Sequence, residues 1–295
     1  MANLKDIQRQ IKSVSNTQKT TRAMKLVSTA KLRRAEELAK RSRLFAEKTG
    51  DVISDIASRI KCQKESGIDS RCFAKLEAPK MVDIIFVTAD KGLCGGFNIQ
   101  TIKAVKKLMA QYKDEKVKVR IRGVGKKGVE FFKYNEIELL DAVKDLSSAP
   151  DMQRAAEFIT GSIDDFMDGT IDAVHLVYNG YKNILTQELH VNQVLPVLFE
   201  DFNCQEGSTS MIEVEAADEE VMLESLIRKY VEYSMYYALI DSVAAEHSAR
   251  MQAMDAATNN AKEMVKALNV KFNKARQEAI TTELIEIISG VESMK

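Results

Sequence analysis

The glycine-rich segment Gly123-Val124-Gly125-Lys126-Lys127-Gly128 is the clearest candidate for chemistry in this sequence of 295 residues. It fits the pattern G-x-G-x-x-G, follows an apolar run that predicts a strand, and opens a segment expected to be helical. In that context the pattern is typical of enzymes that hold a dinucleotide pyrophosphate at a helix N-terminus. However, a complete predicted strand, turn and helix precede it, and no acidic residue is clearly placed about twenty residues further on to hold a ribose. We therefore expect a tight strand-to-helix turn, with a dinucleotide-dependent enzyme as the alternative.

A second glycine-rich turn spans residues 90–98, at the end of a predicted strand. It does not match a phosphate-binding loop, because no Gly-Lys-Ser/Thr follows its glycines. We expect either a close backbone approach or a contact surface there. Its central residues are Gly92, Leu93, Cys94, Gly95 and Gly96.

The histidines and cysteines do not form a recognisable catalytic or metal-binding pattern. The three histidines lie on predicted strands or on a helical seam, without an evident acidic or metal-ligating companion: His175, His190 and His247. The four cysteines show no C-x-x-C spacing: Cys62, Cys72, Cys94 and Cys204. We expect packing or ordinary hydrogen bonding for the histidines, a reducing cytoplasmic compartment, and no catalytic residue, metal or cofactor.

The central part of the chain, residues 79–200, alternates between predicted strands and helices. Strands are expected at 81–89, 117–122, 173–178 and 187–194, with a possible short strand at 137–140. Helices are expected after each glycine-rich turn, to about 112 and about 133, and from 151 to about 167. The last two strands could form a hairpin across 179–182. This alternation predicts a Rossmann-like, three-layer α/β domain with a mostly parallel sheet.

Both ends of the chain are free of helix breakers. The only prolines are Pro79, Pro150 and Pro196, and neither Gly nor Pro occurs in residues 1–49 or 208–289. We therefore expect long helices over about 1–58 and 210–290. A break of the second helix near Asn259-Asn260 is the alternative, although no Gly or Pro marks it.

Each predicted terminal helix carries a heptad seam of apolar or small residues. The C-terminal seam comprises Leu226, Tyr230, Tyr233, Tyr237, Ile240, Ala244, His247, Met251, Met254, Thr258, Ala261, Val265, Leu268, Phe272, Ala275 and Ala279. The N-terminal seam comprises Leu4, Ile7, Ile11, Val14, Gln18, Thr21, Lys25, Ser28, Leu32, Ala35 and Ala39. The two seams predict a long antiparallel coiled coil. The last twenty or so residues of the longer helix would then lack a partner in this chain, and their apolar side chains imply a sleeve from another chain.

Charge is divided among the same three parts. Residues 1–49 carry a net charge of +9, residues 50–207 of −3 and residues 208–295 of −6, within a total of zero. A nucleic-acid-binding arm at the N-terminus is a further alternative. The pI of about 6.9 and the seam on the basic helix disfavour it. No apolar run is long enough for a membrane span, and we expect no secretory signal.

Five segments resemble the gamma subunit of F-type ATP synthases, in the order of that family and across the whole chain. They are Leu4-Lys5-Asp6-Ile7, the run from Ser15 to Val27, the loop from Ala89 to Asn98, and the C-terminal motifs at 249–258 and 273–290. The resemblance implies a rotor shaft without catalytic residues of its own. Rotation of the shaft would couple proton or sodium flow through a c-ring to ATP synthesis and hydrolysis at the beta subunits.

The same resemblance implies partners and contact residues. The coiled coil would stand inside the hexamer of alpha and beta subunits, and the α/β domain would form a foot with the epsilon subunit on the c-ring. The implied location is the cytoplasmic face of the bacterial inner membrane, peripheral and through the complex only, without nucleic acid. The implied hexamer contacts are Arg22, Met24, Lys25, Arg276, Gln277, Thr281, Leu284, Ile285 and Ile288.

Two features bear on how far the resemblance carries. Lys25 places a positive charge beside Met24, so the strength of coupling does not carry over from the family. Plant plastid relatives have an inserted regulatory cysteine pair in the central domain. Only Cys204 lies late in that domain here, so we expect no thiol switch.

Overall fold

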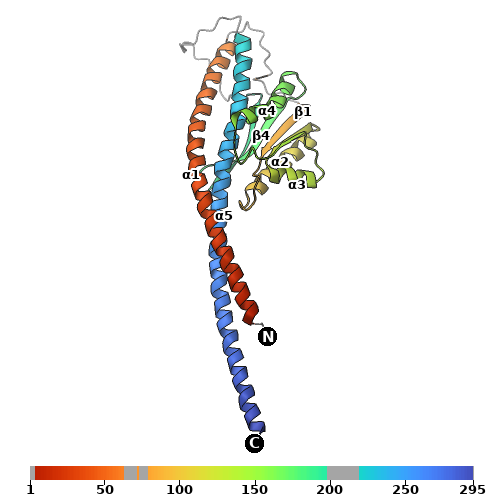
Figure 1. The fold of residues 1–295 in the computed structure, drawn as a ribbon. Coiled ribbons are helices and arrows are strands. Elements are labelled where there is room, and N and C mark those ends of the chain that lie inside the picture. The colour runs from red at the N-terminus through yellow and green to blue at the C-terminus, as the bar shows by residue number, and fades with distance from the viewer. Residues whose placement is uncertain (1–3, 63–71, 73–78, 198–218, 295) are drawn as a thin grey trace. The chain divides into compact units, whose positions relative to one another are not determined.

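The computed structural model describes residues 4–62, 72, 79–197 and 219–294, which form two compact units (Figure 1). One unit contains residues up to Thr29 and from Arg250 onward, and the other contains Ala30–Ala249. Two long helices, α1 (Leu4–Cys62) and α5 (Glu219–Ser293), contribute to both. Cys204, and the parts of the predicted domain ranges at 1–3, 198–200 and 210–218, lie outside the described residues. The three-part domain division stays a prediction.

The larger unit contains a five-stranded sheet with the order β3-β2-β1-β4-β5. The strands are β1 (Met81–Val87), β2 (Lys118–Val124), β3 (Asp141–Val143), β4 (Ala173–Tyr181) and β5 (Gln187–Leu195). The shorter helices are α2 (Phe97–Asp114), α3 (Lys126–Tyr134) and α4 (Met152–Met167). Strands β1 to β4 pair in parallel, and β5 pairs with β4 in the antiparallel sense. The predicted mostly parallel α/β sheet is therefore confirmed.

The sheet lies between two layers of helices because successive side chains of β1 point to opposite faces. Ile84 and Phe86 pack with α2 and α3, whereas Ile85 and Val87 pack with α4 and with α5. Figure 1 shows α4 and the pair α2 and α3 as separate layers of this unit. The expected three layers are present, and the third layer includes a stretch of α5.

The largest differences from the predicted boundaries lie at the short strand and at the hairpin. The short strand expected at 137–140 is wrong, because the Ile137 amide closes the end of α3 onto the Phe132 carbonyl at 3.0 Å. The Leu140 amide donates to the Ile121 carbonyl at 2.8 Å, and the register of β3 with β2 runs from Asp141 to Val143. Strand β4 continues to Tyr181, so the hairpin turn lies at 182–186 rather than 179–182. The side chain of Asn183 holds that turn by accepting the amide of Thr186 at 2.8 Å.

The smaller unit consists of the antiparallel pairing of α1 with α5. Lys25 Nζ lies 2.6 Å from Asp255 Oδ1, and the hydroxyls of Thr21 and Thr258 are 2.8 Å apart. Along α5, the predicted seam residues from Met254 to Ala279 are buried or half-buried, whereas most of the residues between them are exposed. The heptad prediction is confirmed here. Helix α5 also continues through residues 259 and 260, so the predicted alternative of a break there is wrong.

Within the larger unit, α5 packs on two sides. On one side Tyr233 donates its hydroxyl to the Ser42 carbonyl of α1 at 3.0 Å. On the other, a second stripe joins the sheet core: Ile227, Val231, Met235, Ala238 and Leu239. The heptad seam alone did not predict this second face.

A buried ionic network ties β1 and β2 to α4. Asp83, which is fully buried, accepts Arg120 Nε at 2.6 Å and the Ser162 hydroxyl at 2.8 Å. Arg122 Nε lies 3.3 Å from the same carboxylate. Arg120 Nη2 lies 2.5 Å from Asp165 Oδ2 of α4. A buried charge is costly unless it is paired and hydrogen-bonded. This network therefore stabilises the packing of α4 on the sheet only while all of its members are present, because losing one leaves another buried charge without its partner.

The described residues lack both a membrane-spanning helix and a cluster of metal-ligating side chains. In those ranges, none of the helices has the combination of length and apolar character that crossing a bilayer requires. Among the same residues, no three or more His, Cys, Asp or Glu side chains are grouped so that they could hold a metal ion.

Candidate functional site

The glycine-rich turn before α3 has its backbone donors already in use. The amide of Gly125 donates to Val143 O at 2.9 Å, and that of Lys127 to Ala89 O at 3.1 Å. The amide of Lys126 donates to Asp90 Oδ1 at 2.9 Å, and that of Gly128 to Thr88 Oγ1 at 3.0 Å. A pyrophosphate would need these amides at the helix N-terminus. The geometry therefore argues against the dinucleotide alternative at this turn.

Close packing explains why these positions are glycine. A Cβ on Gly123 would lie 2.3 Å from the Phe86 ring, and one on Gly128 would lie 2.4 Å from the same ring. Gly125 has φ of +98°, and a Cβ there would lie 1.9 Å from the Thr88 carbonyl oxygen. The prediction of a tight strand-to-helix turn is confirmed.

Asp90 occupies the position at the start of α3 where an anionic ligand would otherwise bind. Its carboxylate accepts the amides of Lys126 at 2.9 Å and Asp145 at 3.2 Å, and the Ser147 hydroxyl at 2.8 Å. Burial alone would raise the pKa of Asp90, but the hydrogen bonds from Lys126, Ser147 and Asp145 outweigh it and hold the pKa below its ordinary value. The residue acts as an internal cap for the helix.

We expect Asp90→Asn to reduce stability at neutral pH, with a difference that shrinks on acidification. The folded pKa lies below the unfolded one, so the carboxylate stabilises the fold above the unfolded value of about 4, and that stabilisation is lost as pH falls through the folded pKa. Urea unfolding of both proteins between about pH 7 and pH 3 measures this. A difference that stays constant with pH would contradict the assigned role.

The second glycine-rich turn is anchored on α5 inside the larger unit. Cys94 and Phe97 are buried with Ala89 and with two small residues of α5, Ala245 and Ala249. The side chain of Asn98 fixes the turn by accepting the Ala89 amide at 2.9 Å, and its amide group lies 3.3 Å from Cys94 Sγ.

The five central residues of this turn are divided between packing and exposure. Cys94 is buried, Gly95 has a φ of +57° and Leu93 is 60% exposed. A close backbone approach does not explain Gly92 or Gly96, because a Cβ at Gly92 would meet no atom within 4 Å and one at Gly96 only a side chain at 3.8 Å. Leu93, Gly95 and Gly96 lie on the surface and Gly92 is half-buried.

The predicted contact residues of α1 fall on different sides of the helix. Arg22 and Met24 are exposed, whereas Lys25 is half-buried in the seam with Asp255. Two neighbours that the prediction omitted, Leu26 and Val27, are 63% and 58% exposed. Their apolar character off the seam was the signal that could have identified them, because two adjacent exposed apolar side chains form a patch that indicates a further partner.

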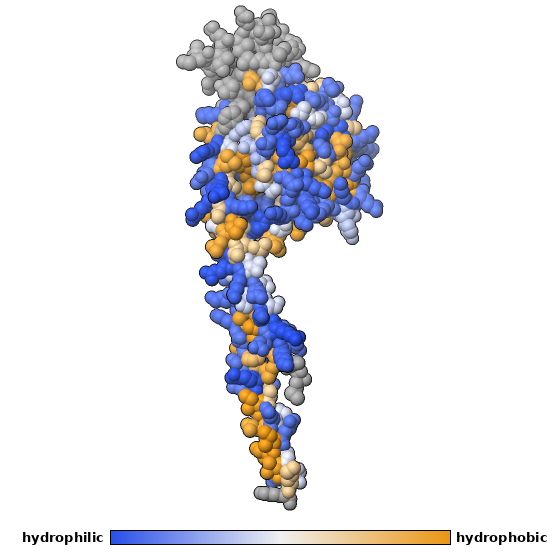
Figure 2. All heavy atoms as spheres, viewed as in Figure 1, coloured by the Kyte–Doolittle hydropathy of each residue, from blue (hydrophilic) through white to orange (hydrophobic). Residues whose placement is uncertain are grey.

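The predicted contact residues of α5 are all exposed. Arg276 and Gln277 face away from the seam, and Thr281 donates its hydroxyl to the Gln277 carbonyl at 2.9 Å. Leu284, Ile285 and Ile288 are 54%, 58% and 61% exposed. Figure 2 shows the resulting hydrophobic surface over the end of α5. The apolar residues of this segment, which we name the α5 tip, are Ile280, Leu284, Ile285, Ile287, Ile288 and Val291.

The histidines with described contacts have structural roles. The Tyr112 hydroxyl lies 2.5 Å from His175 Nε2. His190 stacks on Tyr178 with ring centroids 5.0 Å apart. Both interactions agree with the expected packing and hydrogen bonding.

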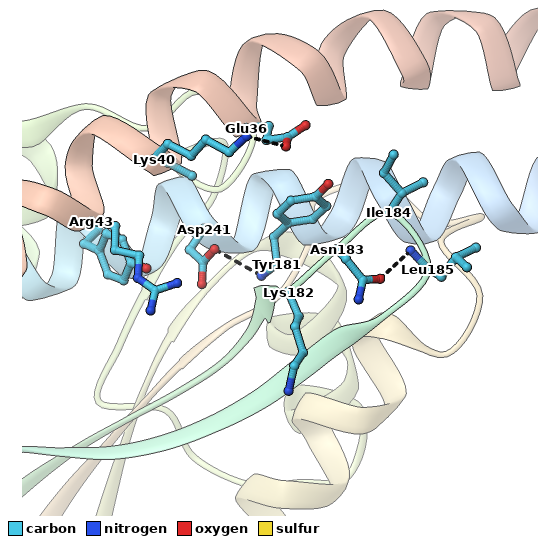
Figure 3. A pocket seen from close by; sticks show the side chains of 11 residues that line it. Glu36, Lys40, Arg43, Tyr181, Lys182, Asn183, Ile184, Leu185 and Asp241 are labelled. Carbon is cyan, nitrogen blue, oxygen red and sulfur yellow. Dashed lines mark hydrogen bonds and ion pairs between the residues drawn. The ribbon is translucent and has the colours of Figure 1, made fainter.

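A pocket of about 590 Å³ lies inside the larger unit, between α1, the β4–β5 turn and α5 (Figure 3). Lys40 pairs with Glu36 at 2.9 Å, and Asp241 accepts the Tyr181 amide at 3.0 Å. Burial raises the pKa of Asp241. Glu36 and Asp241 both bind groups of this chain. The pocket residues therefore hold α1, α5 and the β4–β5 turn together, and these two carboxylates do not form a catalytic acid–base pair.

Comparison with known proteins identifies relatives over the full length. The family model described as ATP synthase matches residues 3–294. The ATP synthase gamma chain of Sulfurimonas denitrificans is 75% identical over 295 residues, with 100% of each chain covered. Those of Nitratiruptor and Campylobacter jejuni (strain RM1221) are 60% and 56% identical, again covering 100% of each chain.

Solved structures show the same fold at lower identity. The central stalk and c-ring structure of the Tetrahymena thermophila mitochondrial ATP synthase contains a chain with a TM-score of 0.59 and 23% identity. That match covers 81% of this chain and 99% of the other. A Euglena gracilis mitochondrial ATP synthase chain gives a TM-score of 0.55 at 19% identity, over 92% and 95% of the two chains. On the matches of the family model and of the full-length relatives, the chain belongs to the ATP synthase gamma chain family.

Proposed function

We propose that this chain is the central rotor shaft of an F-type ATP synthase and carries no catalytic residues of its own. It would couple ion-driven rotation of a c-ring to ATP synthesis and hydrolysis at the beta subunits. One observation supports the rotor role in addition to family membership. The seam of α5 is covered as far as Ala279, whereas the α5 tip beyond it remains exposed. An apolar surface of this kind needs a sleeve from other chains.

The proposed partners follow from the surfaces of each part. The alpha and beta subunits would contact Arg22 and Met24 on α1, Arg276 and Gln277 on α5, and the α5 tip. The similarity of the fold to a chain in a central stalk and c-ring structure supports the c-ring as a partner of the α/β part. The epsilon subunit is proposed there from the family resemblance alone. We place the protein at the cytoplasmic face of the bacterial inner membrane, held peripherally through the complex.

A paired helix with unlike sides provides a physical route to coupling. The N-terminal 49 residues carry a charge of +9, while the α5 tip is apolar. Chemically identical sites around such a shaft would each meet a different side of it. Contacts that differ between states are what allosteric coupling requires. Turning the shaft would exchange the states of the sites in sequence.

Reconstitution with alpha and beta subunits tests the proposal. The combined preparation should show cooperative ATPase activity well above that of alpha and beta alone. The isolated chain should show none. If adding the chain produced no gain in cooperative hydrolysis, the rotor assignment would be wrong.

The double variant Ile285→Glu with Ile288→Glu should weaken assembly without weakening the chain. Both side chains are already exposed, so the free energy of unfolding of the isolated chain should change by less than about 0.5 kcal/mol. Placing two carboxylates in an apolar sleeve should reduce affinity for the hexamer at least about tenfold. Titration of labelled chain into alpha and beta subunits measures the effect.

The matched control is Met264→Glu with Val270→Glu. These apolar residues are 55% and 70% exposed on the same helix but lie outside the predicted contacts. Equal losses of affinity in both double variants would show that the α5 tip has no special role.

A further inference from the structure

We infer that Lys25 and Asp255 fix the register in which α1 and α5 pair, and so act as positioning residues for the outward-facing contacts of both helices. The purpose of a fixed register rests on the proposed function, whereas the geometry of the pair comes from the smaller unit. Lys25 Nζ lies 2.6 Å from Asp255 Oδ1, and the side chains are only 37% and 48% exposed. The pair joins residues 230 positions apart in the chain.

The polar stretch of the α1 seam beside this pair does not select a register by itself, and the nearest buried large apolar seam residues of α1 are Ile7 and Leu32. A heptad repeat looks the same after a slide of seven residues, so shape complementarity of large apolar side chains normally selects one register. Here the seam of α1 is polar or small at Gln18, Thr21 and Ser28. A hydroxyl contact of 2.8 Å between Thr21 and Thr258 adds only a neutral hydrogen bond. The charged pair is therefore the specific element of this stretch.

The charges one heptad away discriminate against both neighbouring registers. Asp255 and Lys262 occupy the same heptad position in successive repeats of α5, as do Gln18 and Lys25 in α1. A slide in one direction would place Lys25 opposite Lys262, which is a like-charge contact. A slide in the other would place Asp255 opposite neutral Gln18. The observed register keeps the attractive pair and avoids the repulsive one, which is how coiled coils specify alignment.

Register matters because the outward-facing residues sit on different helices. Arg22 and Met24 belong to α1, whereas Arg276 and Gln277 belong to α5. A slide of seven residues would move one set past the other by about 10 Å along the helices. A rigid partner that fits both sets in one register would lose one of them in the other.

Charge reversal at position 25 gives the sharpest test, because Lys25→Asp repels Asp255 and attracts Lys262. Spin labels at the exposed positions Lys12 and Ala256, introduced as non-natural residues, report the register in the full chain. We expect the mean distance in Lys25→Asp to lengthen by about 10 Å. Adding Asp255→Lys to this variant should restore a population of molecules with the native distance, because it restores an attractive pair. Lys25→Met should give both distances, and Lys25→Arg only the native one.

The matched control is Arg9→Asp, which reverses an exposed charge of α1 outside the seam, where Arg9 pairs only locally with Asp6 at 3.8 Å. It should leave the distance unchanged. An unchanged distance in both Lys25→Asp and Lys25→Met would overturn the inference, as would an equal shift in the Arg9 control. Circular dichroism of each variant confirms that the helices persist.

A second readout separates this inference from the proposed function. In the reconstituted membrane complex, ions pumped per ATP hydrolysed should fall in Lys25→Asp and recover when Asp255→Lys is added. A distance shift without a change in that ratio would keep the register role and contradict its purpose in coupling, while the reconstitution with alpha and beta subunits tests the proposed function itself. A change in the ratio without a distance shift would overturn the register role.

Discussion

Replacing Asp83 by Ala is expected to lower the free energy of unfolding of the α/β part by about 3–5 kcal/mol. The carboxylate is fully buried and binds Arg120, Arg122 and Ser162. Its removal leaves Arg122, itself almost wholly buried, with only a 3.5 Å contact to Asp165. A buried guanidinium that loses its buried carboxylate partner and keeps only one long contact is more costly than removal of both charges. Urea denaturation followed by circular dichroism measures the change.

Asp114→Ala is the control for this prediction. Asp114 is exposed at the end of α2, so its loss should change stability by less than about 0.5 kcal/mol. A double variant, Asp83→Leu with Arg122→Leu, should recover part of the loss because it removes both members of the buried pair. A loss below about 1 kcal/mol in Asp83→Ala would show that the network contributes little to stability.

Gly125→Ala is the second large effect, with an expected loss of about 2–5 kcal/mol. The residue has φ of +98° and ψ of 135°, a combination that side chains with a Cβ rarely adopt. The added Cβ would also meet the Thr88 carbonyl oxygen at 1.9 Å. The turn would have to open, which would break the contacts of the α3 amides with Asp90 and Thr88. Thermal and urea unfolding measure the loss.

Gly92→Ala is the matched control in the other glycine-rich turn. A Cβ at Gly92 meets no atom within 4 Å, so the substitution should change stability by less than about 0.5 kcal/mol. Similar losses in the two variants would mean that general loop stiffness, rather than the specific close approach at Gly125, governs stability.

The sequence predicted those parts of the fold that depend on local pattern. Apolar runs located the parallel strands β1, β2 and β4 but not β3, and the heptads located the seam from Met254 to Ala279. The pattern could not show that Asp83 is paired, because its partner Arg120 lies directly across from it only once β1 and β2 are in register. The second stripe of α5 was missed for the same reason, since the surface it covers is assembled from distant strands.

The candidate sites show the same limit. A glycine pattern cannot distinguish a bound phosphate from an internal carboxylate, and Asp90 lies 36 residues before the amide it accepts from Lys126. Likewise, the sequence placed Lys25 on the α1 seam but did not identify Asp255 as its partner, because that pairing depends on the register of the two helices. By contrast, the exposure of the α5 tip followed from sequence, because the shorter N-terminal helix could not cover it.

Direct observation of rotation tests the central claim most closely. The complex with alpha and beta subunits would be fixed to a surface, with a probe attached to the exposed position Lys133 of α3. Our account predicts that ATP drives unidirectional turning of the probe, with pauses that follow the number of beta subunits. Continued hydrolysis of ATP with a stationary or randomly moving probe would contradict it.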